Sequence, residues 1–211
     1  MEAPLVRNLG VKDLPDVWVE MQAFTAERTA ATRDEIWFVE HPPVYTLGMR
    51  ASREHLLAPG DIPVVQIDRG GQVTYHGPGQ LVAYVMLNLE RRSLTPRKLV
   101  QALESAVIDT VADHGVTAVA RRDAPGVYVE GAKLAAVGLR VKRHCSYHGL
   151  AVNVAMDLAP FAGINPCGYA DLRVTDLRQL AGIESVARFR EDFEPRLLAR
   201  LATSSPSSFR T

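Results

Sequence analysis

Cys167 stands in a short segment, Asn165–Tyr169 (NPCGY), whose composition is that of an exposed turn. A structural cysteine usually sits inside an apolar run, whereas this one lies between a proline and a glycine. A thiol in such a loop can be reached by a substrate and can act as a nucleophile. The same pattern also allows a thiol without a chemical role, so the segment alone leaves both interpretations open.

Lys133 follows Gly131 and Ala132 and opens an apolar stretch, LAAVGLRV. A lysine at the end of a strand is most often a solvated charge that protects a sheet edge. Its chemical interest is the effect of an ammonium on a thiol. A free cysteine with a pKa of about 8.5 is only a few per cent thiolate at neutral pH, and a neighbouring cation lowers that pKa. Beside Cys167, Lys133 would therefore activate the thiol.

A glycine-rich segment, 69–80 (RGGQVTYHGPGQ), holds four glycines, a proline and His76. Such a density of glycine lets backbone amides approach a ligand closely, or allows a sharp turn. The segment contains neither the Gly-Lys-Ser/Thr of a phosphate-binding loop nor a Gly-x-Gly-x-x-Gly turn. A nucleotide site is therefore not indicated.

His144, Cys145 and His148 are close in sequence, as metal ligands often are. In a strand their side chains would alternate between faces, and no second cluster of cysteine or histidine completes a site, so we expect no metal. His148 can instead be considered as a partner of Cys167, as in thiol proteases. A disulfide between the two cysteines is not expected in a reducing compartment.

The composition predicts one ordinary globular domain. The 211 residues are 47% hydrophobic and 23% charged, and the 24 basic and 24 acidic residues balance, which argues against nucleic acid as a partner. The pairs 121–122 and 142–143 are basic and would meet an acidic protein or, more simply, be solvated. No apolar run has the length of a membrane span, and the N-terminus does not resemble a signal peptide, so we expect a cytoplasmic protein.

Periodicity and turn residues predict an α+β (α/β mixed) domain around a largely antiparallel or mixed sheet. We expect the domain to span 1–202 and to be followed by a flexible tail at 203–211. Helices are predicted at 14–24, 95–115, 175–181 and 185–201, the last one broken or kinked by Pro195. Strands are predicted at 35–40, 44–47, 64–67, 81–89, 116–120, 127–129, 133–141 and 148–154.

Four segments together resemble the lipoyl(octanoyl) transferase family, also called octanoyl-ACP:protein N-octanoyltransferase. They are RGGQVTYHGPGQLVAY (69–84), GAKLAAVGLRV (131–141), HGLAVNV (148–154) and INPCGY (164–169). Their order and spacing make a chance match implausible, and the similarity covers nearly the whole chain except the tail. The resemblance implies a catalytic domain like those of lipoate and biotin protein ligases, with a large mixed sheet and a smaller sheet flanked by helices.

The resemblance also implies an activity and its partners. An octanoyl group would move from octanoyl-acyl carrier protein to a specific lysine of apo lipoyl domains, those of 2-oxoacid dehydrogenase E2 subunits and of the glycine cleavage H protein. This is the first step of protein lipoylation. No cofactor is implied, because the acyl group arrives on the phosphopantetheine arm of the carrier, and neither nucleic acid nor membrane is a partner. We expect a monomer.

Catalytic roles carry over from the family to Cys167, as the nucleophile that forms the acyl thioester, and to Lys133, which tunes that thiol. Substrate contacts carry over to three further stretches: Arg69, Gly70, Gly71, Gln72, Val73, Thr74, Tyr75 and His76; Ala136, Val137 and Gly138; and Gly149, Leu150 and Ala151. Cys145 lies outside the motifs and inherits no role.

The eight-carbon chain needs an apolar slot. The alternation of Ala83, Val85, Ala135 and Val137 suits one wall of that slot, but suits an ordinary core better. Backbone amides near Cys167 and Gly77 are candidates for binding the oxyanion.

Three other functions remain open at this stage. An ATP-dependent lipoate-protein ligase would share the fold but lack the loop cysteine and need a basic adenylate site. A cysteine hydrolase would pass the acyl group to water. A non-catalytic module would bind an acyl chain or its carrier reversibly.

Overall fold

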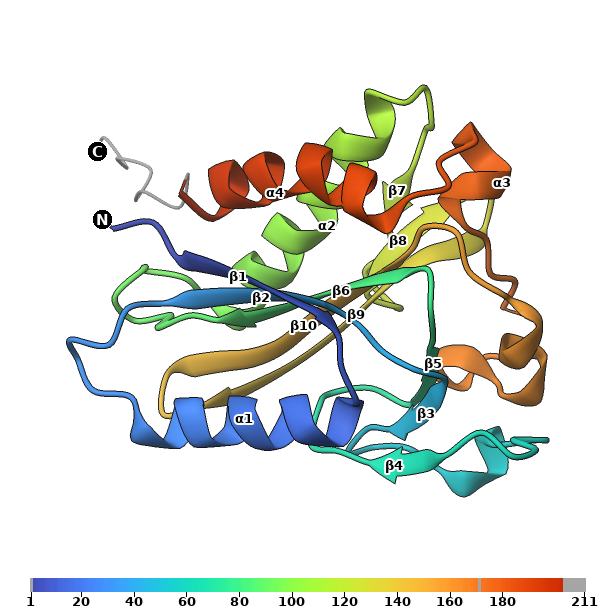
Figure 1. Ribbon diagram of the computed structural model, residues 1–211, viewed down its shortest axis with the longest axis horizontal. Coiled ribbons are helices and arrows are strands. Elements are labelled where there is room, and N and C mark those ends of the chain that lie inside the picture. The colour runs from blue at the N-terminus through green and yellow to red at the C-terminus, as the bar shows by residue number, and fades with distance from the viewer. Residues whose placement is uncertain (1, 171, 203–211) are drawn as a thin grey trace.

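A computed structural model of the chain describes residues 2–170 and 172–202; the side chain of Cys167 and the predicted tail at 203–211 lie outside the described part. The strands form two sheets (Figure 1). The larger has seven strands in the order β1 (Leu5–Val11), β2 (Glu35–Glu40), β6 (Gln80–Met86), β10 (Cys145–Asn153), β9 (Ala132–Lys142), β8 (Gly126–Val129) and β7 (Val119–Ala120). The smaller is ordered β4 (Val64–Gln66), β3 (Val44–Leu47) and β5 (Val73–His76).

Both sheets are mixed, and the sequence predicted this for the larger one. In the larger sheet β1 pairs with β2 in parallel, and the other neighbours pair antiparallel. In the smaller sheet β3 runs parallel to β4 and antiparallel to β5. The predicted combination of a large mixed sheet, a smaller sheet and flanking helices is confirmed.

Helices cover the two faces of the larger sheet unequally. The helices are α1 (Leu14–Glu27), α2 (Pro96–Ala112), α3 (Leu177–Ala181) and α4 (Val186–Ala202), with short 3₁₀ turns η1 (Arg53–His55), η2 (Ala159–Gly163) and η3 (Pro166–Gly168). Figure 1 shows α2 and α4 on one face, with α1 and the smaller sheet on the other. The largest apolar cluster therefore fills the space between the sheet and the α2–α4 pair.

The structure corrects the sequence predictions in three places. The strand β1 was not predicted, because its residues are mostly exposed at the sheet edge and it shows no apolar run. The strand β5 lies inside the glycine-rich segment, where we predicted only a turn or loop. Pro195 does not break the last helix, because α4 runs through it from Val186 to Ala202.

The second helix begins as predicted. The side chain of Thr95 accepts a hydrogen bond from the backbone N–H of Lys98 at 3.2 Å, and Pro96 occupies the first turn, where its missing N–H costs nothing. Leu99, Leu103 and Val107 are buried on the face toward the sheet. This helix packs against the strands β8 and β9. The smaller sheet lies on the opposite face of the larger sheet (Figure 1).

Candidate active site

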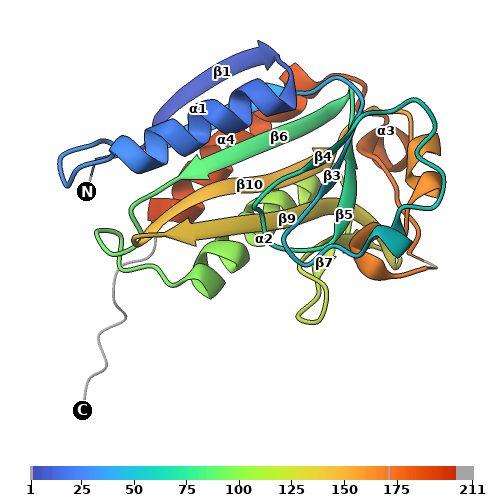
Figure 2. The same ribbon diagram turned by 90° about the horizontal axis from the view of Figure 1, so that it is seen from below.

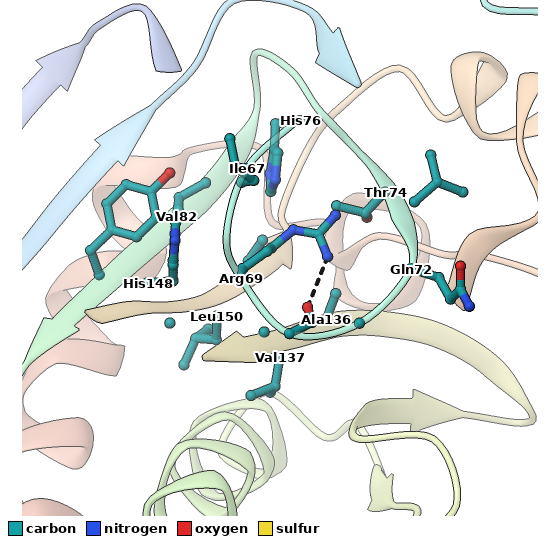
Figure 3. Close-up of a pocket in the computed structure, with 17 residues that line it drawn as sticks. Ile67, Arg69, Gln72, Thr74, His76, Val82, Ala136, Val137, His148 and Leu150 are labelled. Atoms are coloured by element: carbon teal, nitrogen blue, oxygen red, sulfur yellow. Dashed lines mark hydrogen bonds between the residues drawn. The ribbon is translucent and has the colours of Figure 1, made fainter. Parts of the chain in front are cut away.

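A narrow pocket opens between the glycine-rich loop and the centre of the larger sheet. Figure 2 shows the smaller sheet, which carries this loop, lying over β9 and β10. The pocket is drawn in Figure 3 and has a volume of about 60 Å³. It is lined by Ile67, Arg69, Gly70, Gly71, Gln72, Val73, Thr74, His76, Val82, Tyr84, Ala136, Val137, Gly138, His148, Gly149, Leu150 and Ala151.

The floor of the pocket is apolar because three central strands turn small and branched residues toward it. Val82 from β6, Ala136 from β9 and Ala151 from β10 share the face toward the pocket. Val137 and Leu150 also line it, but their side chains pack with the core on the other face. The antiparallel register sets Ala151 opposite both Val82 and Ala136. Such a floor suits an extended hydrocarbon chain better than a polar ligand.

Glycine allows the loop to lie directly on the sheet. The N–H of Gly70 donates to the carbonyl of Leu139 at 3.0 Å, which ties the loop to β9. A Cβ atom at Gly138 would lie 3.1 Å from Cδ of Arg69 and 3.1 Å from the carbonyl oxygen of Gly70. A larger residue at this position would therefore press on the loop and narrow the pocket.

Arg69 crosses the pocket with its guanidinium held by neutral groups. Its Nη2 donates to the backbone carbonyl and to Oγ1 of Thr46, both at 2.8 Å, and its Nη1 donates to the carbonyl of Gly70 at 3.0 Å (Figure 3). The side chain is buried, and so is Thr46. A fixed, buried cation is thus available near any polar group that a ligand brings into the pocket.

His76 lines the pocket as a neutral imidazole. Burial, with the nearby His41 and Arg69, lowers the pKa of His76 to about 3. Its Nδ1 lies 2.7 Å from Oε1 of Gln80, whose own amide nitrogen donates to Asn153. Because Oε1 of Gln80 is an acceptor, Nδ1 of His76 carries the proton and Nε2 keeps its lone pair.

His148 is held by a carboxylate behind the pocket. Oδ1 of Asp68 accepts hydrogen bonds from Nε2 of His148 at 2.9 Å and from Nε1 of Trp18 at 2.9 Å, and Oδ2 accepts from the hydroxyl of Tyr147. Burial alone would raise the pKa of Asp68, but these hydrogen bonds lower it well below its usual range. Nε2 of His148 is thus bound to Asp68, and a pairing of His148 with Cys167 stays a prediction.

Lys133 is buried, which is unusual for a lysine at a strand end. Its Nζ lies 3.4 Å from the carbonyl oxygen of Pro125 and 5.2 Å from the centre of the Tyr128 ring. Glu104 is close enough for Lys133 to oppose the rise that burial causes in the pKa of that carboxyl. The interpretation of Lys133 as a solvated edge charge is therefore wrong.

The segment that carries Cys167 forms the turn η3, which lies beside the pocket residue Gln72. A Cβ atom at Gly168 would lie 3.3 Å from Nε2 of His55 and 3.4 Å from Cγ of Gln72, a pocket residue. Further along, Val174 forms a parallel bridge with Lys133, whose N–H and carbonyl bond to residues 173 and 175. The segment therefore approaches Gln72 of the pocket at Gly168 and pairs with Lys133 at Val174.

The predicted substrate residues gather around this pocket with one exception. Tyr75 points to the opposite face of β5, where its ring packs 5.5 Å from the ring centres of Tyr45 and Phe161. Strand alternation explains this, because Thr74 and His76 then face the pocket. Four lining residues were missed by the sequence reasoning: Ile67, Val82, Tyr84 and His148.

The alternative proposed for the apolar wall is also resolved. Ala83, Val85 and Ala135 belong to the core between the sheet and the helices α2 and α4 and are not among the lining residues. Val137 packs against the same core and also borders the pocket. The pocket takes the opposite face of β6, with Val82 and Tyr84. Both faces of this strand are apolar, so its sequence could not distinguish them.

Other sequence expectations can be compared with the described residues. Within 2–170 and 172–202, no group of three or more histidine, cysteine or acidic side chains is arranged to hold a metal. Cys145 is a buried free thiol in β10. Arg121 is exposed and pairs with Asp123 at 2.6 Å, as expected for solvated loop charge. No helix in the described part is both long and apolar enough to cross a membrane.

Comparison with known proteins identifies the class. The family described as lipoyl protein ligase A/B catalytic domain matches residues 15–202, and the chain belongs to that family. A crystal structure of lipoate-protein ligase A bound with ATP superposes with a TM-score of 0.75 at 12% identity, covering 95% of this chain and 86% of the other. Biotin protein ligase from Aquifex aeolicus gives a TM-score of 0.55 at 14% identity, over 97% and 69% of the two chains. These two likenesses concern the fold alone.

Within this class the chain is a member of the octanoyltransferases, which are transferase enzymes. The octanoyltransferase of Thiobacillus denitrificans is 61% identical over 176 residues, 83% of this chain and 81% of its relative. The octanoyltransferase of Chromobacterium violaceum is 50% identical over 204 residues, 97% of this chain and 99% of its relative. The resemblance seen in the four sequence segments is therefore confirmed.

Proposed function

We propose that this enzyme moves an octanoyl group from acyl carrier protein to a lysine of lipoyl domains through a thioester on Cys167. The observation that carries the proposal is the burial of Lys133, only 4% exposed, on the strand bridged by Val174 to the Cys167 segment. A buried ammonium is costly to retain unless it interacts with a partner charge or serves chemistry. Glu104 already interacts with this ammonium, and a thiolate at Cys167 would be a further charge that it stabilises.

In the first half-reaction the Cys167 thiolate attacks the carbonyl carbon of the octanoyl thioester. A new carbon–sulfur bond forms, the bond to the phosphopantetheine sulfur breaks, and that sulfur leaves with the proton of the Lys133 ammonium, which leaves Lys133 neutral. The apolar floor, with Val82, Ala136 and Ala151, would hold the hydrocarbon chain during this exchange. One thioester replaces another, so the step needs no other energy source.

In the second half-reaction the neutral amine of the target lysine attacks the acyl-enzyme. An amide bond forms, the bond to Cys167 breaks, and the amine loses one proton. Lys133 in its neutral form is a suitable acceptor for that proton, and the returning Cys167 thiolate is then stabilised by the resulting ammonium. Conversion of a thioester to an amide is downhill, so neither ATP nor another cofactor is needed.

The partners follow from this chemistry. The donor is octanoyl-acyl carrier protein, and the acceptors are apo lipoyl domains of 2-oxoacid dehydrogenase E2 subunits and of the glycine cleavage H protein. The reaction belongs in the cytoplasm, where a reducing environment keeps Cys167 as a thiol. We keep the expectation of a monomer, which light scattering coupled to size-exclusion chromatography tests.

Intact mass spectrometry tests the thioester directly. The purified protein is incubated with octanoyl-acyl carrier protein, denatured and weighed, beside the variants Cys167→Ala and Cys145→Ala. We expect an octanoyl adduct in the wild type and in Cys145→Ala, and none in Cys167→Ala. An adduct that persists in Cys167→Ala overturns the assignment of the nucleophile.

The same preparations separate the remaining alternatives. Adding an apo lipoyl domain should discharge the acyl-enzyme with formation of the octanoyl-lysine amide. A hydrolase would release octanoate at the same rate with or without the acceptor, and a binding module would lose its acyl group on denaturation. A ligase would act on free octanoate only when ATP is present.

A further inference from the structure

The pocket has one end at the Cys167 segment and another at an aromatic cluster. Gln72, which contacts the Gly168 position of that segment, and His148 lie toward opposite ends of the pocket in Figure 3. The ring of Tyr84 lies 6.2 Å from the ring of His148, centre to centre, so Tyr84 belongs to the far end. A chain attached at Cys167 and lying in the pocket therefore approaches Tyr84 with its tail.

Strand register gives the approximate length of this path. On β9, Ala136 is three residues beyond Lys133, and Gly138 is five residues beyond it. At about 3.3 Å per residue these positions are roughly 10 and 17 Å along the strand. Gly138 is paired with Gly149, and Gly149 with Tyr84, so Tyr84 marks the farther position. An extended eight-carbon chain is roughly 9 Å long at single-bond geometry. Its tail would end at about the level of Ala136, and the Tyr84 position is the next one along the path.

Tyr84 is held rigidly by a chain of hydrogen bonds. Nδ1 of His41 lies 2.7 Å from the backbone carbonyl of Lys12, which can only accept, so Nδ1 carries the proton. Nε2 of His41 is then the acceptor for the hydroxyl of Tyr84 at 2.7 Å. Burial lowers the pKa of His41, which keeps this neutral form. Rotation of the Tyr84 ring would leave two buried polar groups unsatisfied.

The space behind Tyr84 is filled by the protein core. Tyr84 packs in the apolar cluster under the helix α1, together with Val17, Met21 and Trp37. On its open side stands His148, whose ring is anchored through Asp68. The ring of Tyr84 thus separates the pocket from a core that a longer acyl chain would have to displace.

From this geometry we propose that the ring of Tyr84 limits the length of the acyl chain. The proposal deepens the proposed function, since it takes Cys167 as the point of attachment. Tyr84 lies on the opposite face of β6 from Ala83 and Val85, the two β6 residues that the sequence suggested for the wall of the acyl slot. Loss of the ring should lengthen the chain that the enzyme prefers.

The test compares Tyr84→Leu with Tyr84→Phe on acyl carrier protein loaded with chains of six to fourteen carbons. Burial of each added CH₂ group contributes about 0.8 kcal/mol, which is about fourfold in affinity. We expect Tyr84→Leu to raise kcat/KM for ten- or twelve-carbon chains, relative to eight, by about fivefold or more. Tyr84→Phe keeps the ring and should keep the wild-type preference.

A binding experiment separates this proposal from the chemistry at Cys167. Calorimetry with free fatty acids on a Cys167→Ala background needs no acyl transfer, and Tyr84→Leu should shift the tightest-binding length upward there too. A folded Tyr84→Leu protein with the wild-type ranking in both measurements overturns the proposal. If binding shifts but no thioester forms on Cys167, the chemical mechanism fails and the length limit stands.

A second variant covers the case in which Tyr84→Leu does not fold. Ala136→Leu adds bulk to the pocket floor nearer the attachment end, at a position that is only half-buried. Its preferred chain should be shorter than that of the wild type, by about two carbons. An unchanged preference in a folded Ala136→Leu protein contradicts the direction assigned to the acyl chain.

Discussion

Nε2 of His148 lies 2.9 Å from Oδ1 of Asp68, and this hydrogen bond fixes one wall of the pocket from behind. His148 has a left-handed backbone, with a φ of 60°, which is uncommon for a residue other than glycine. The rings of Tyr147 and His148 stack with centres 5.0 Å apart, and the same carboxylate binds both side chains. Asp68 therefore holds the side chains of two consecutive β10 residues on one side of the strand.

Asp68→Asn should loosen this wall. The substitution removes the negative charge that receives three side-chain hydrogen bonds, and bonds to a charged group are worth about 1.5–3 kcal/mol each. Because the pocket shape depends on His148, we expect KM for octanoyl-acyl carrier protein to rise more than kcat falls. Steady-state kinetics measure this split, with Asp61→Asn, an exposed site, as the matched control. Equal kinetics in the two variants would argue against a positioning role.

Stability should fall in mild acid because three imidazoles are buried in neutral form. Burial lowers the pKa of His41 and of His148, and it lowers the pKa of His76 to about 3. Unfolded histidine has a pKa of about 6.5, so below that pH the unfolded chain binds more protons than the folded one, and stability decreases as pH falls. For His76 the loss is about 1.4 kcal/mol per pH unit between roughly pH 6 and 3.

Urea denaturation at pH 7.5, 6.0 and 5.0 measures this slope. His76→Asn should reduce it by about one proton, whereas His144→Asn, at an exposed position, should leave it unchanged. A slope that is the same in wild type and His76→Asn would mean that His76 does not stay neutral in the folded protein.

Loss of the Lys133 charge should leave less thiolate on Cys167 at neutral pH. Lys133→Met keeps much of the apolar stem and removes the ammonium. A rise of one to two units in the thiol pKa corresponds to roughly 10- to 100-fold slower acylation at pH 7. The difference should shrink near pH 9.5, where both proteins are largely thiolate. Iodoacetamide alkylation followed across pH gives the thiol pKa, and Lys142→Met, at an exposed site, serves as the control. Superimposable alkylation profiles would remove Lys133 from the mechanism.

Two glycines of the site should respond differently to alanine. A Cβ atom at Gly149 would lie 1.9 Å from the carbonyl oxygen of Ala83, in the backbone of the neighbouring strand, so the strands must separate. We expect Gly149→Ala to cost about 3 kcal/mol or more. Gly138→Ala meets Arg69 and Gly70 at 3.1 Å and should cost about 1 kcal/mol, with a raised KM. Thermal denaturation and steady-state kinetics of the two variants test this difference. Similar melting temperatures for both would contradict it.

The sequence by itself determined the types of element and the family. Long apolar runs and proline or glycine boundaries were enough for the central strand β6 and the helix α2, because these signals are local. The four motif segments also identified nearly all residues that gather at the pocket. Local patterns failed for β1, whose exposed residues become a strand only by pairing with β2, and for β5, which folds within a glycine-rich segment.

Only the tertiary structure decided which side chains face the pocket and which lie in the core. Every residue of β6 is buried. Strand geometry places Ala83 and Tyr84 on opposite faces, but the sequence does not show which of the two faces the pocket. Lys133 is a second case. Its sequence position is typical of a solvated strand end, but in the folded protein it is buried and its backbone pairs with Val174. Pairing between strands far apart in sequence sets these environments, and a one-residue change of register would exchange the two faces. For that reason the far end of the acyl pocket, at Tyr84 and His41, could be located only after the chain was folded.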